Sequence, residues 1–298
     1  MKEAILKYTG LSEDKGKTVE TVWKRKFDIS SSLFTSLKLT GKLRLNGEIC
    51  RSVDIVSEGD ILTADVTEKE NSENIVPADM GIDIIYEDEF IMVINKPRGI
   101  SVHPSMGNFC NTLANGVINY WAQNGEMHKF HAVNRIDKDT SGICVIAKNR
   151  FAHGVLSKQM KTKQFRRRYM ALVNGILPQK TGTIDKPIMR ESESIIKRIV
   201  SPEGKTAVTH YEVIAEYAGY SLVDIYLETG RTHQIRVHFS DMGHPLIGDW
   251  LYGNGDNERD IAKGHLLHAY YAELYHPYTK KLMCFDVHIP NDMEKLIK

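Results

Sequence analysis

The stretch His131-Ala132-Val133-Asn134-Arg135-Ile136-Asp137-Lys138-Asp139-Thr140-Ser141-Gly142 decides the fold, because it joins a charged loop to an apolar run. A continuous apolar run bounded by turn residues predicts a buried strand over residues 142–148. The loop then places Asp137 beside the end of that strand, where polar side chains commonly line a cleft. The alternative is a solvated turn in which Asp139 and Thr140 bond to nearby backbone.

The segments around this stretch read as runs of strands with a few helices, not as strict strand–helix alternation. This arrangement predicts an α+β fold with a mixed, mostly antiparallel sheet and flanking helices. Thr229 or Thr232 is expected to cap the last of these helices, and Gly243 to end it. The expected strands are 82–86, 90–95, 142–148, 168–174, 208–216 and 222–228, and the expected helices are 112–123, 150–161 and 232–242.

Residues 1–75 are expected to form a separate small unit. Helical spacing appears over 18–25 and 30–39, and the alternating stretch 43–49 surrounds Asn46-Gly47, a strong hairpin signal. The polar residues 67–80 read as a linker, and residues 76–298 as the larger domain.

Charge is unevenly distributed in a chain whose net charge is only +1. Residues 15–51 carry nine Lys or Arg and three Asp or Glu, whereas residues 54–73 carry seven acids and one lysine. A basic face on a small folded unit is typical of phosphate contact, and a solvated surface is the alternative.

Composition places the chain among ordinary globular proteins, with 298 residues, 42% hydrophobic and 26% charged. We find neither an apolar run long enough to span a bilayer nor an N-terminal secretion signal, so we expect a cytoplasmic protein without membrane attachment. The cysteines are too scattered for a zinc site or a disulfide framework, and we expect reduced thiols. They are Cys50, Cys110, Cys144 and Cys284.

Two further clusters carry chemistry. The stretch 161–168 holds five cations and leads to Tyr169, a combination that suits a phosphate chain and a stacked base, unless Tyr169 is only a core aromatic. The stretch 228–238 places His233 and Arg236 three residues apart, so they share one face of a helix. His233 and His238 are poorly spaced for a metal, and we expect no metal site.

Together these motifs resemble those of the RluA-type pseudouridine synthases, which are RNA-modifying isomerases. The resemblance covers nearly all of residues 82–292, and the order and spacing of several motifs agree. Residues 1–75 resemble, more weakly, the small RNA-binding domain called the alpha-L motif. The matching motifs lie at 86–89, 95–99, 131–142, 169, 229–236, 243–249, 267–269 and 276–277.

This resemblance implies a pseudouridine synthase fold with a bent sheet, and conversion of uridine to pseudouridine without cofactor or metal. It makes Asp137 the catalytic carboxylate, Arg231 its charge partner and Tyr169 the residue facing the extruded base. Whether Asp137 attacks C1′ or removes the 2′ proton stays open. The residues expected to contact RNA are Lys24, Arg25, Lys42, Arg44, Lys96, Arg135, Arg166, Arg167 and Arg168.

The expected partner is structured RNA, with large-subunit (23S) ribosomal RNA preferred over transfer RNA, and the expected state is a monomer. One departure stands out, because the family usually has His and Leu where this chain has Asn134 and Ile136. Two other classes are weighed against an active synthase. They are a non-catalytic RNA-binding or ribosome-assembly protein, and a hydrolase or nucleosidase of small molecules.

Overall fold

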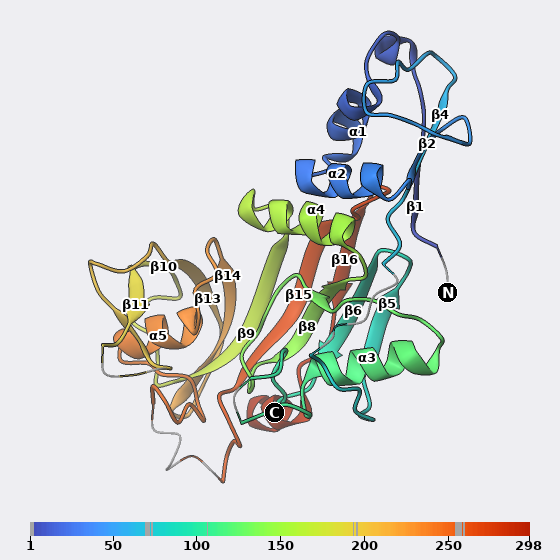
Figure 1. The fold of residues 1–298 in the computed structure, drawn as a ribbon. Coiled ribbons are helices and arrows are strands. Elements are labelled where there is room, and N and C mark those ends of the chain that lie inside the picture. The colour runs from blue at the N-terminus through green and yellow to red at the C-terminus, as the bar shows by residue number, and fades with distance from the viewer. Residues whose placement is uncertain are drawn as a thin grey trace.

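The computed structural model describes residues 3–68, 72, 74–105, 107–192, 194, 196–253, 258 and 260–298. Figure 1 shows one large bent sheet with helices packed against it, and a small N-terminal unit seated on helix α4 (Arg150–Lys161). The expected α+β class is therefore confirmed. The helices of the described residues are too short or too polar to cross a bilayer.

The large sheet has ten strands, in the order β10-β13-β14-β9-β15-β8-β6-β5, with β7 beside β8 and β16 beside β15. Among the named pairs in the described chain, β8 and β15 alone run parallel, so the sheet is mixed and mostly antiparallel as expected. Its strands are β5 (Asp83–Glu87), β6 (Ile91–Lys96), β7 (His131–Ala132), β8 (Ser141–Ala147), β9 (Arg166–Asn174), β10 (Thr181–Asp185), β13 (Val208–Tyr217), β14 (Tyr220–Leu227), β15 (Leu267–Tyr275) and β16 (Leu282–Asp286).

The strand β8 lies at the centre of the core, and all seven of its residues are buried. Its side chains alternate between the two faces of the sheet, as a strand requires. Ile143 and Val145 pack with apolar residues of α4, whereas Cys144 and Ile146 pack with those of α3 (Leu113–Gln123). Burial on both faces explains why this strand is apolar throughout rather than alternating.

The N-terminal unit has its own sheet, ordered β1-β4-β2-β3. Thr18 and Ser30 cap the two expected helices through their side chains. Asn46 and Gly47 both have positive φ, 53° and 88°, as the tightest hairpin turn requires. The elements are β1 (Ile5–Thr9), the 3₁₀ turn η1 (Ser12–Asp14), α1 (Val19–Phe27), α2 (Ser31–Leu39), β2 (Leu43–Leu45), β3 (Glu48–Ile49) and β4 (Ile61–Asp65).

Aromatic side chains join this unit to the larger domain. The Phe27 ring stacks on Tyr278 with centroids 6.1 Å apart, and meets Phe151 of α4 edge-on at 6.4 Å. Nearby, the Lys158 ammonium lies 2.6 Å from the Asp28 carboxylate. The domain boundary near residue 75 stays a prediction, and residues 69–71 and 73 of the expected linker lie outside the described residues.

One expected helix begins later than predicted. Helix α5 (Gln234–Asp241) starts at 234, not 232, and its N-cap is His233 in the left-handed conformation without a side-chain cap. The expected capping by Thr229 or Thr232 is therefore wrong. The Gln234 side chain instead accepts hydrogen bonds from the Thr229 hydroxyl and the Arg231 amide, both 2.9 Å, which holds residues 229–233 as a turn.

Several elements were not predicted. Strands β11 (Ile188–Arg190) and β12 (Arg198–Val200) form a two-stranded hairpin outside the large sheet, and α6 (Asn291–Ile297) ends the chain. Strands β1, β7, β10, β15 and β16 were also missed. The cysteines are unpaired as expected, with Cys50 and Cys144 buried and Cys110 and Cys284 exposed.

Gly142 gives a stability test, because its φ is +107° and a Cβ there would lie 2.3 Å from the Ala269 carbonyl oxygen. We expect Gly142→Ala to lower the free energy of unfolding by about 3 kcal/mol or more, from strain and overlap with β15. Gly154→Ala, in exposed space on α4, is the matched control and should be neutral or stabilising. Urea unfolding midpoints measure both, and equal midpoints for the two variants would contradict the role of Gly142.

Candidate active site

The loop that carries Asp137 begins where β7 leaves β8, and Asn134 makes that junction. The Asn134 side-chain oxygen accepts from the Val145 amide at 2.8 Å, and its amide nitrogen donates to the Ile143 carbonyl at 3.0 Å. The side-chain amide of Asn134 thereby pairs with the backbone of β8 in the way that the backbone of a neighbouring strand would. Asn134 is buried, and these two bonds settle the pose of the loop at the position where the chain departs from the family pattern.

Two cations of the 95–99 motif hold the backbone of the same loop. The Lys96 ammonium donates to the carbonyls of Pro97, Ile100 and Lys138 at 2.7–3.0 Å. Arg98 donates to the carbonyls of Asp139 and His265. These hydrogen bonds tie the backbone of the loop to the 95–99 motif and to residue 265.

Lys96 was expected to contact RNA, and that prediction is wrong. Its side chain is fully buried, and its three donors are used by backbone carbonyls. Burial lowers the pKa of its ammonium to about 8. Lys96 therefore supports the loop and does not reach a ligand.

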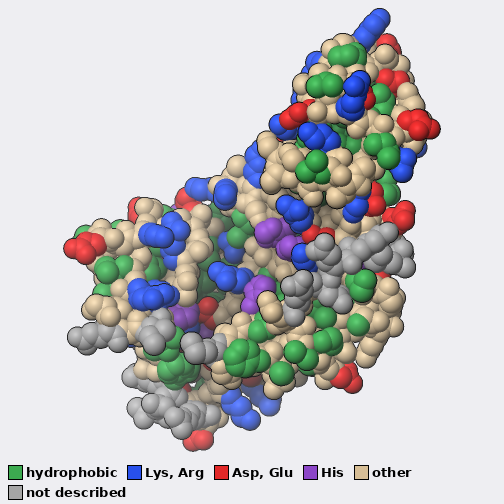
Figure 2. Space-filling model, viewed as in Figure 1, with side chains coloured by type: hydrophobic (Ala, Val, Ile, Leu, Met, Phe, Trp, Pro, Cys, Tyr) green, Lys and Arg blue, Asp and Glu red, His purple; other side chains and the backbone are tan. Residues whose placement is uncertain are grey.

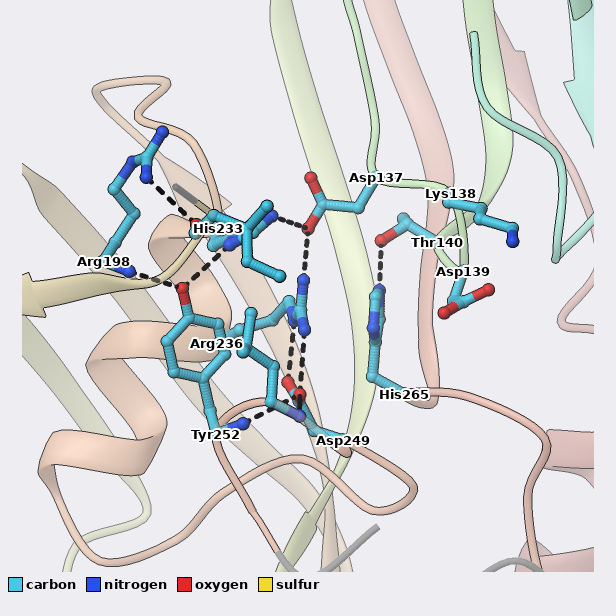
Figure 3. A network of polar contacts seen from close by, with 12 residues as sticks. Asp137, Lys138, Asp139, Thr140, Arg198, His233, Arg236, Asp249, Tyr252 and His265 are labelled. Atoms are coloured by element: carbon cyan, nitrogen blue, oxygen red, sulfur yellow. Dashed lines mark hydrogen bonds and ion pairs between the residues drawn. The ribbon is translucent and has the colours of Figure 1, made fainter. Parts of the chain in front are cut away.

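The Asp137 carboxylate projects from this loop toward α5, as Figure 3 shows. Its Oδ2 lies 3.1 Å from Nη1 of Arg236, and a quarter of its side chain is exposed. Arg236 also makes a two-pronged contact with Asp249, with Nε and Nη2 donating at 2.7 and 2.8 Å. Burial lowers the pKa of Arg236, but Asp249 and Asp137 outweigh it, so the net pKa is raised and the guanidinium stays charged.

Arg231 was expected to be the charge partner of Asp137, and the structure corrects this. Among the described residues, the guanidinium that meets Asp137 belongs to Arg236, five residues further on. Arg231 is exposed, and its Nε donates to the Thr206 carbonyl at 2.9 Å. The late start of α5 explains the difference, because Arg231 precedes the helix and Arg236 lies on its buried face.

His233 and Tyr252 complete the network around Arg236 in Figure 3. The Arg236 guanidinium lies over the Tyr252 ring, 4.9 Å from its centroid. The Tyr252 hydroxyl accepts from the Arg198 amide at 2.9 Å and lies 2.8 Å from His233 Nδ1. Burial lowers the pKa of His233, so the imidazole is neutral near pH 7 and its Nε2 lies 3.9 Å from Asp137 Oδ2.

Tyr169 lines the same pocket, beneath the loop. It lies on β9 and is 4% exposed, and burial raises the pKa of its phenol, which is therefore uncharged near neutral pH. It lines a pocket together with Asp137, Arg231 and Arg236, and its expected role of facing the extruded base stays a prediction. A second wall of this pocket is apolar, from Ile136, Leu227, Ile235 and Leu267.

The pocket opens into a wider groove of about 600 Å³, and three arginines lie along it. They are Arg135, Arg167 and Arg231. Alternation along β9 places Arg167 on the same face as Tyr169 and turns Arg168 away. Arg168 is bound to Asp224 and lies over Tyr270, so its expected contact with RNA in this groove is not supported.

The other expected RNA contacts lie farther from the pocket. Arg166 is exposed, 3.7 Å from Glu273. In the N-terminal unit, Lys24 and Arg25 are paired with Glu20 and Glu13, which offsets their charge. Lys42 and Arg44 donate to the carbonyls of Thr67 and Gly47, which leaves their charges without a carboxylate partner among the described residues.

Sequence reasoning missed Asp249, Tyr252 and His265. His265 bonds to the Thr140 hydroxyl at 2.8 Å, and burial lowers its pKa well below the usual range. Asp249 ends the 243–249 motif and is fully buried, so the motif itself was a usable signal. Within the described part of the chain, no group of three metal-binding side chains comes together.

Known proteins are similar to this chain in sequence. A family model described as RNA pseudouridylate synthase matches residues 90–241. The chain is 43% identical over 271 residues to the uncharacterized RNA pseudouridine synthase YjbO of Bacillus subtilis, covering 91% of this chain and 95% of that protein. It is 36% identical over 280 residues to the ribosomal large subunit pseudouridine synthase D of Neisseria meningitidis serogroup B, covering 91% and 75%.

A solved structure shares the fold. The human RNA pseudouridylate synthase domain containing 1 superposes with a TM-score of 0.59 at 24% identity, over 72% of this chain and 86% of that one. The sequence relatives carry the argument further, because each alignment covers 91% of this chain, and the family model spans residues 90–241. This chain therefore belongs to the RluA-type RNA pseudouridine synthases, isomerases that act on uridine in RNA.

Proposed function

We propose that this enzyme converts uridines of large-subunit (23S) ribosomal RNA to pseudouridine, with Asp137 as the catalytic carboxylate and without metal or organic cofactor. One observation carries the assignment to Asp137. It is the carboxylate that both lines the pocket and contacts the buried Arg236 guanidinium. This contact holds the Asp137 carboxylate against a fixed positive charge, while part of its side chain stays exposed to a ligand.

The reaction itself needs no external electrons or atoms. The bond between C1′ and N1 breaks, the uracil turns, and a bond forms between C1′ and C5. The proton on C5 leaves and N1 gains one, so substrate and product are isomers. The chemical demand is stabilisation of positive charge on the ribose while the base is detached, which a carboxylate meets.

Arg236 supplies what Asp137 needs in a partly buried site. Burial favours protonation of a carboxyl group, and an opposite charge within about 4 Å favours the ionised form. Asp249 holds Arg236 through two parallel hydrogen bonds, so the guanidinium keeps one free edge directed at Asp137. The arrangement is prepared before RNA binds, which reduces the reorganisation needed during reaction.

The remaining pocket residues suit an extruded uridine. A uridine inside a helix must leave its stack to reach Asp137, at a cost of a few kcal/mol. The Tyr169 ring and the apolar wall of the pocket receive the base, and Arg135 at the rim contacts the RNA that surrounds it. The small pocket and the wide basic groove match a single base and the strand that carries it.

The choice of ribosomal RNA rests on the relatives and on the N-terminal unit. The Neisseria relative is named for the large ribosomal subunit, and the alignment covers 91% of this chain. The N-terminal unit places Lys42 and Arg44 on a folded domain packed against α4. A second basic surface favours a large structured RNA over a free nucleoside.

Removing the Asp137 charge tests the catalytic assignment. We expect Asp137→Asn to fold and bind RNA like the wild type and to form no detectable pseudouridine, because the amide cannot stabilise the cationic ribose. Carbodiimide labelling of RNA after a single-turnover reaction measures the product. Product at a rate within 100-fold of wild type would reject Asp137 as the catalytic carboxylate.

Arg236→Lys tests the charge partner while keeping one positive charge. A lysine cannot contact Asp249 with two donors and Asp137 with a third, so the single-turnover rate at saturating RNA should fall at least 100-fold. Arg231→Lys should instead act mainly on RNA affinity. Urea unfolding checks that the Arg236 variant is folded. A 100-fold loss of rate in Arg231→Lys, with little loss in Arg236→Lys, would instead identify Arg231 as the charge partner of Asp137.

Mapping pseudouridine in cells tests the RNA. In a strain that lacks this protein, we expect sites to disappear from large-subunit ribosomal RNA, and to return with the wild-type gene but not with Asp137→Asn. Losses confined to transfer RNA would contradict the choice of ribosomal RNA and leave the assignment of Asp137 intact.

A further inference from the structure

A second groove lies beside the active site, between the β11–β12 hairpin and the turn at 230–232. It encloses about 470 Å³, and its lining includes the cations Arg190, Arg198, Lys205 and Arg231 against one acid, Glu203. Figure 2 shows Lys and Arg side chains on both walls of the hollow between the lobe of β11 and α5 and the body around α4. The groove therefore adds a basic surface outside the pocket of Asp137.

The two spaces are continuous. Arg231 lines the Asp137 pocket, the wide groove in front of it and the second groove, and Gly230 and Thr232 line both grooves. The Thr206 carbonyl accepts a hydrogen bond from Arg231 Nε, which ties this side chain to the segment beside Lys205. A strand leaving the pocket meets Arg231 first and the hairpin next.

The cations of this groove differ from their neighbours. Within the described residues, the nearby lysines outside it each pair with a carboxylate, Lys180 with Glu216 and Lys186 with Asp241. The four groove cations have no carboxylate within ion-pair distance in that part of the chain, and Arg198 donates to the carbonyls of Ile196 and Lys197. Cations whose charge no internal carboxylate offsets are available to an external anion.

We propose that this groove binds the ribose–phosphate backbone of the RNA strand next to the target uridine, with Arg231 shared between the two sites. The inference rests on the proposed function and adds a second contact to it. Among the described residues that line the groove none is aromatic, so it lacks the rings on which bases usually stack and suits the backbone rather than the bases.

The hairpin is also fixed relative to the reacting groups. The amide of Arg198, at the start of β12, donates to the Tyr252 hydroxyl, and that hydroxyl contacts His233 beside Asp137. Phosphates held at Arg190 and Lys205 are thereby placed at a constant distance from the Asp137 carboxylate. The groove sets the register of the strand as well as adding affinity.

The test uses the full-length enzyme and a 20-nucleotide oligouridylate, whose binding does not depend on the identity of the natural target. We expect Arg190→Gln with Lys205→Gln to weaken binding about 10-fold or more at 0.1 M salt, and to reduce the slope of log K against log salt by about 1.4. The control pair, Lys180→Gln with Lys186→Gln, removes the same charge outside the groove and should keep the wild-type slope. An unchanged slope in the groove variant would overturn the proposal.

A measurement on the wild-type enzyme covers the case in which the groove variant does not fold. Bound oligouridylate should protect Lys205 from acetylation and leave Lys180 and Lys186 reactive. Equal labelling of Lys205 with and without RNA would also overturn the proposal. These readouts are independent of turnover, so an active Asp137→Asn variant would reject the proposed catalysis without touching this inference.

Discussion

The contact on which the site depends is the buried guanidinium of Arg236 held between Asp249 and Asp137. Two carboxylates share one cation, but they are not equivalent. Asp249 is fully buried and accepts two hydrogen bonds from this cation, whereas Asp137 accepts one from it and keeps a quarter of its side chain exposed. A buried charge is tolerated when it is paired and hydrogen-bonded, and here the deeper pair makes the cation available to the outer carboxylate.

The loop that carries Asp137 is ordered by residues far away in the chain. Lys96 and Arg98, some forty residues earlier, bind its backbone carbonyls, and His265, more than a hundred residues later, bonds to Thr140. These side chains do not line the pocket. Lys96 and Arg98 nevertheless belong to the 95–99 motif, and His265 lies just before the 267–269 motif. Together they hold a polar loop at the end of the buried strand β8 through hydrogen bonds to its backbone and to the Thr140 hydroxyl.

Much of the framework followed from local patterns. The apolar run of β8, the helix over 150–161 and the Asn46-Gly47 hairpin each carry their own periodicity or turn signal, and each was predicted. The arginine that contacts Asp137 was not predicted. Arg231 and Arg236 belong to one motif, and which of them faces Asp137 depends on the residue at which α5 begins. That start is decided by the bonds of the Gln234 side chain, which no periodicity reveals. Nothing in the sequence around Lys96 indicates that its ammonium is buried among backbone carbonyls, so it was predicted to contact RNA.

The amide of Asn134 has a consequence for how the loop responds to acid. An imidazole has a titratable ring nitrogen and loses its ability to accept from the backbone once it is protonated, whereas a carboxamide does not titrate. Its two bonds to β8 therefore persist unchanged from neutral to mildly acidic conditions. The junction that aims the catalytic loop is, in this chain, indifferent to the proton concentration of its surroundings.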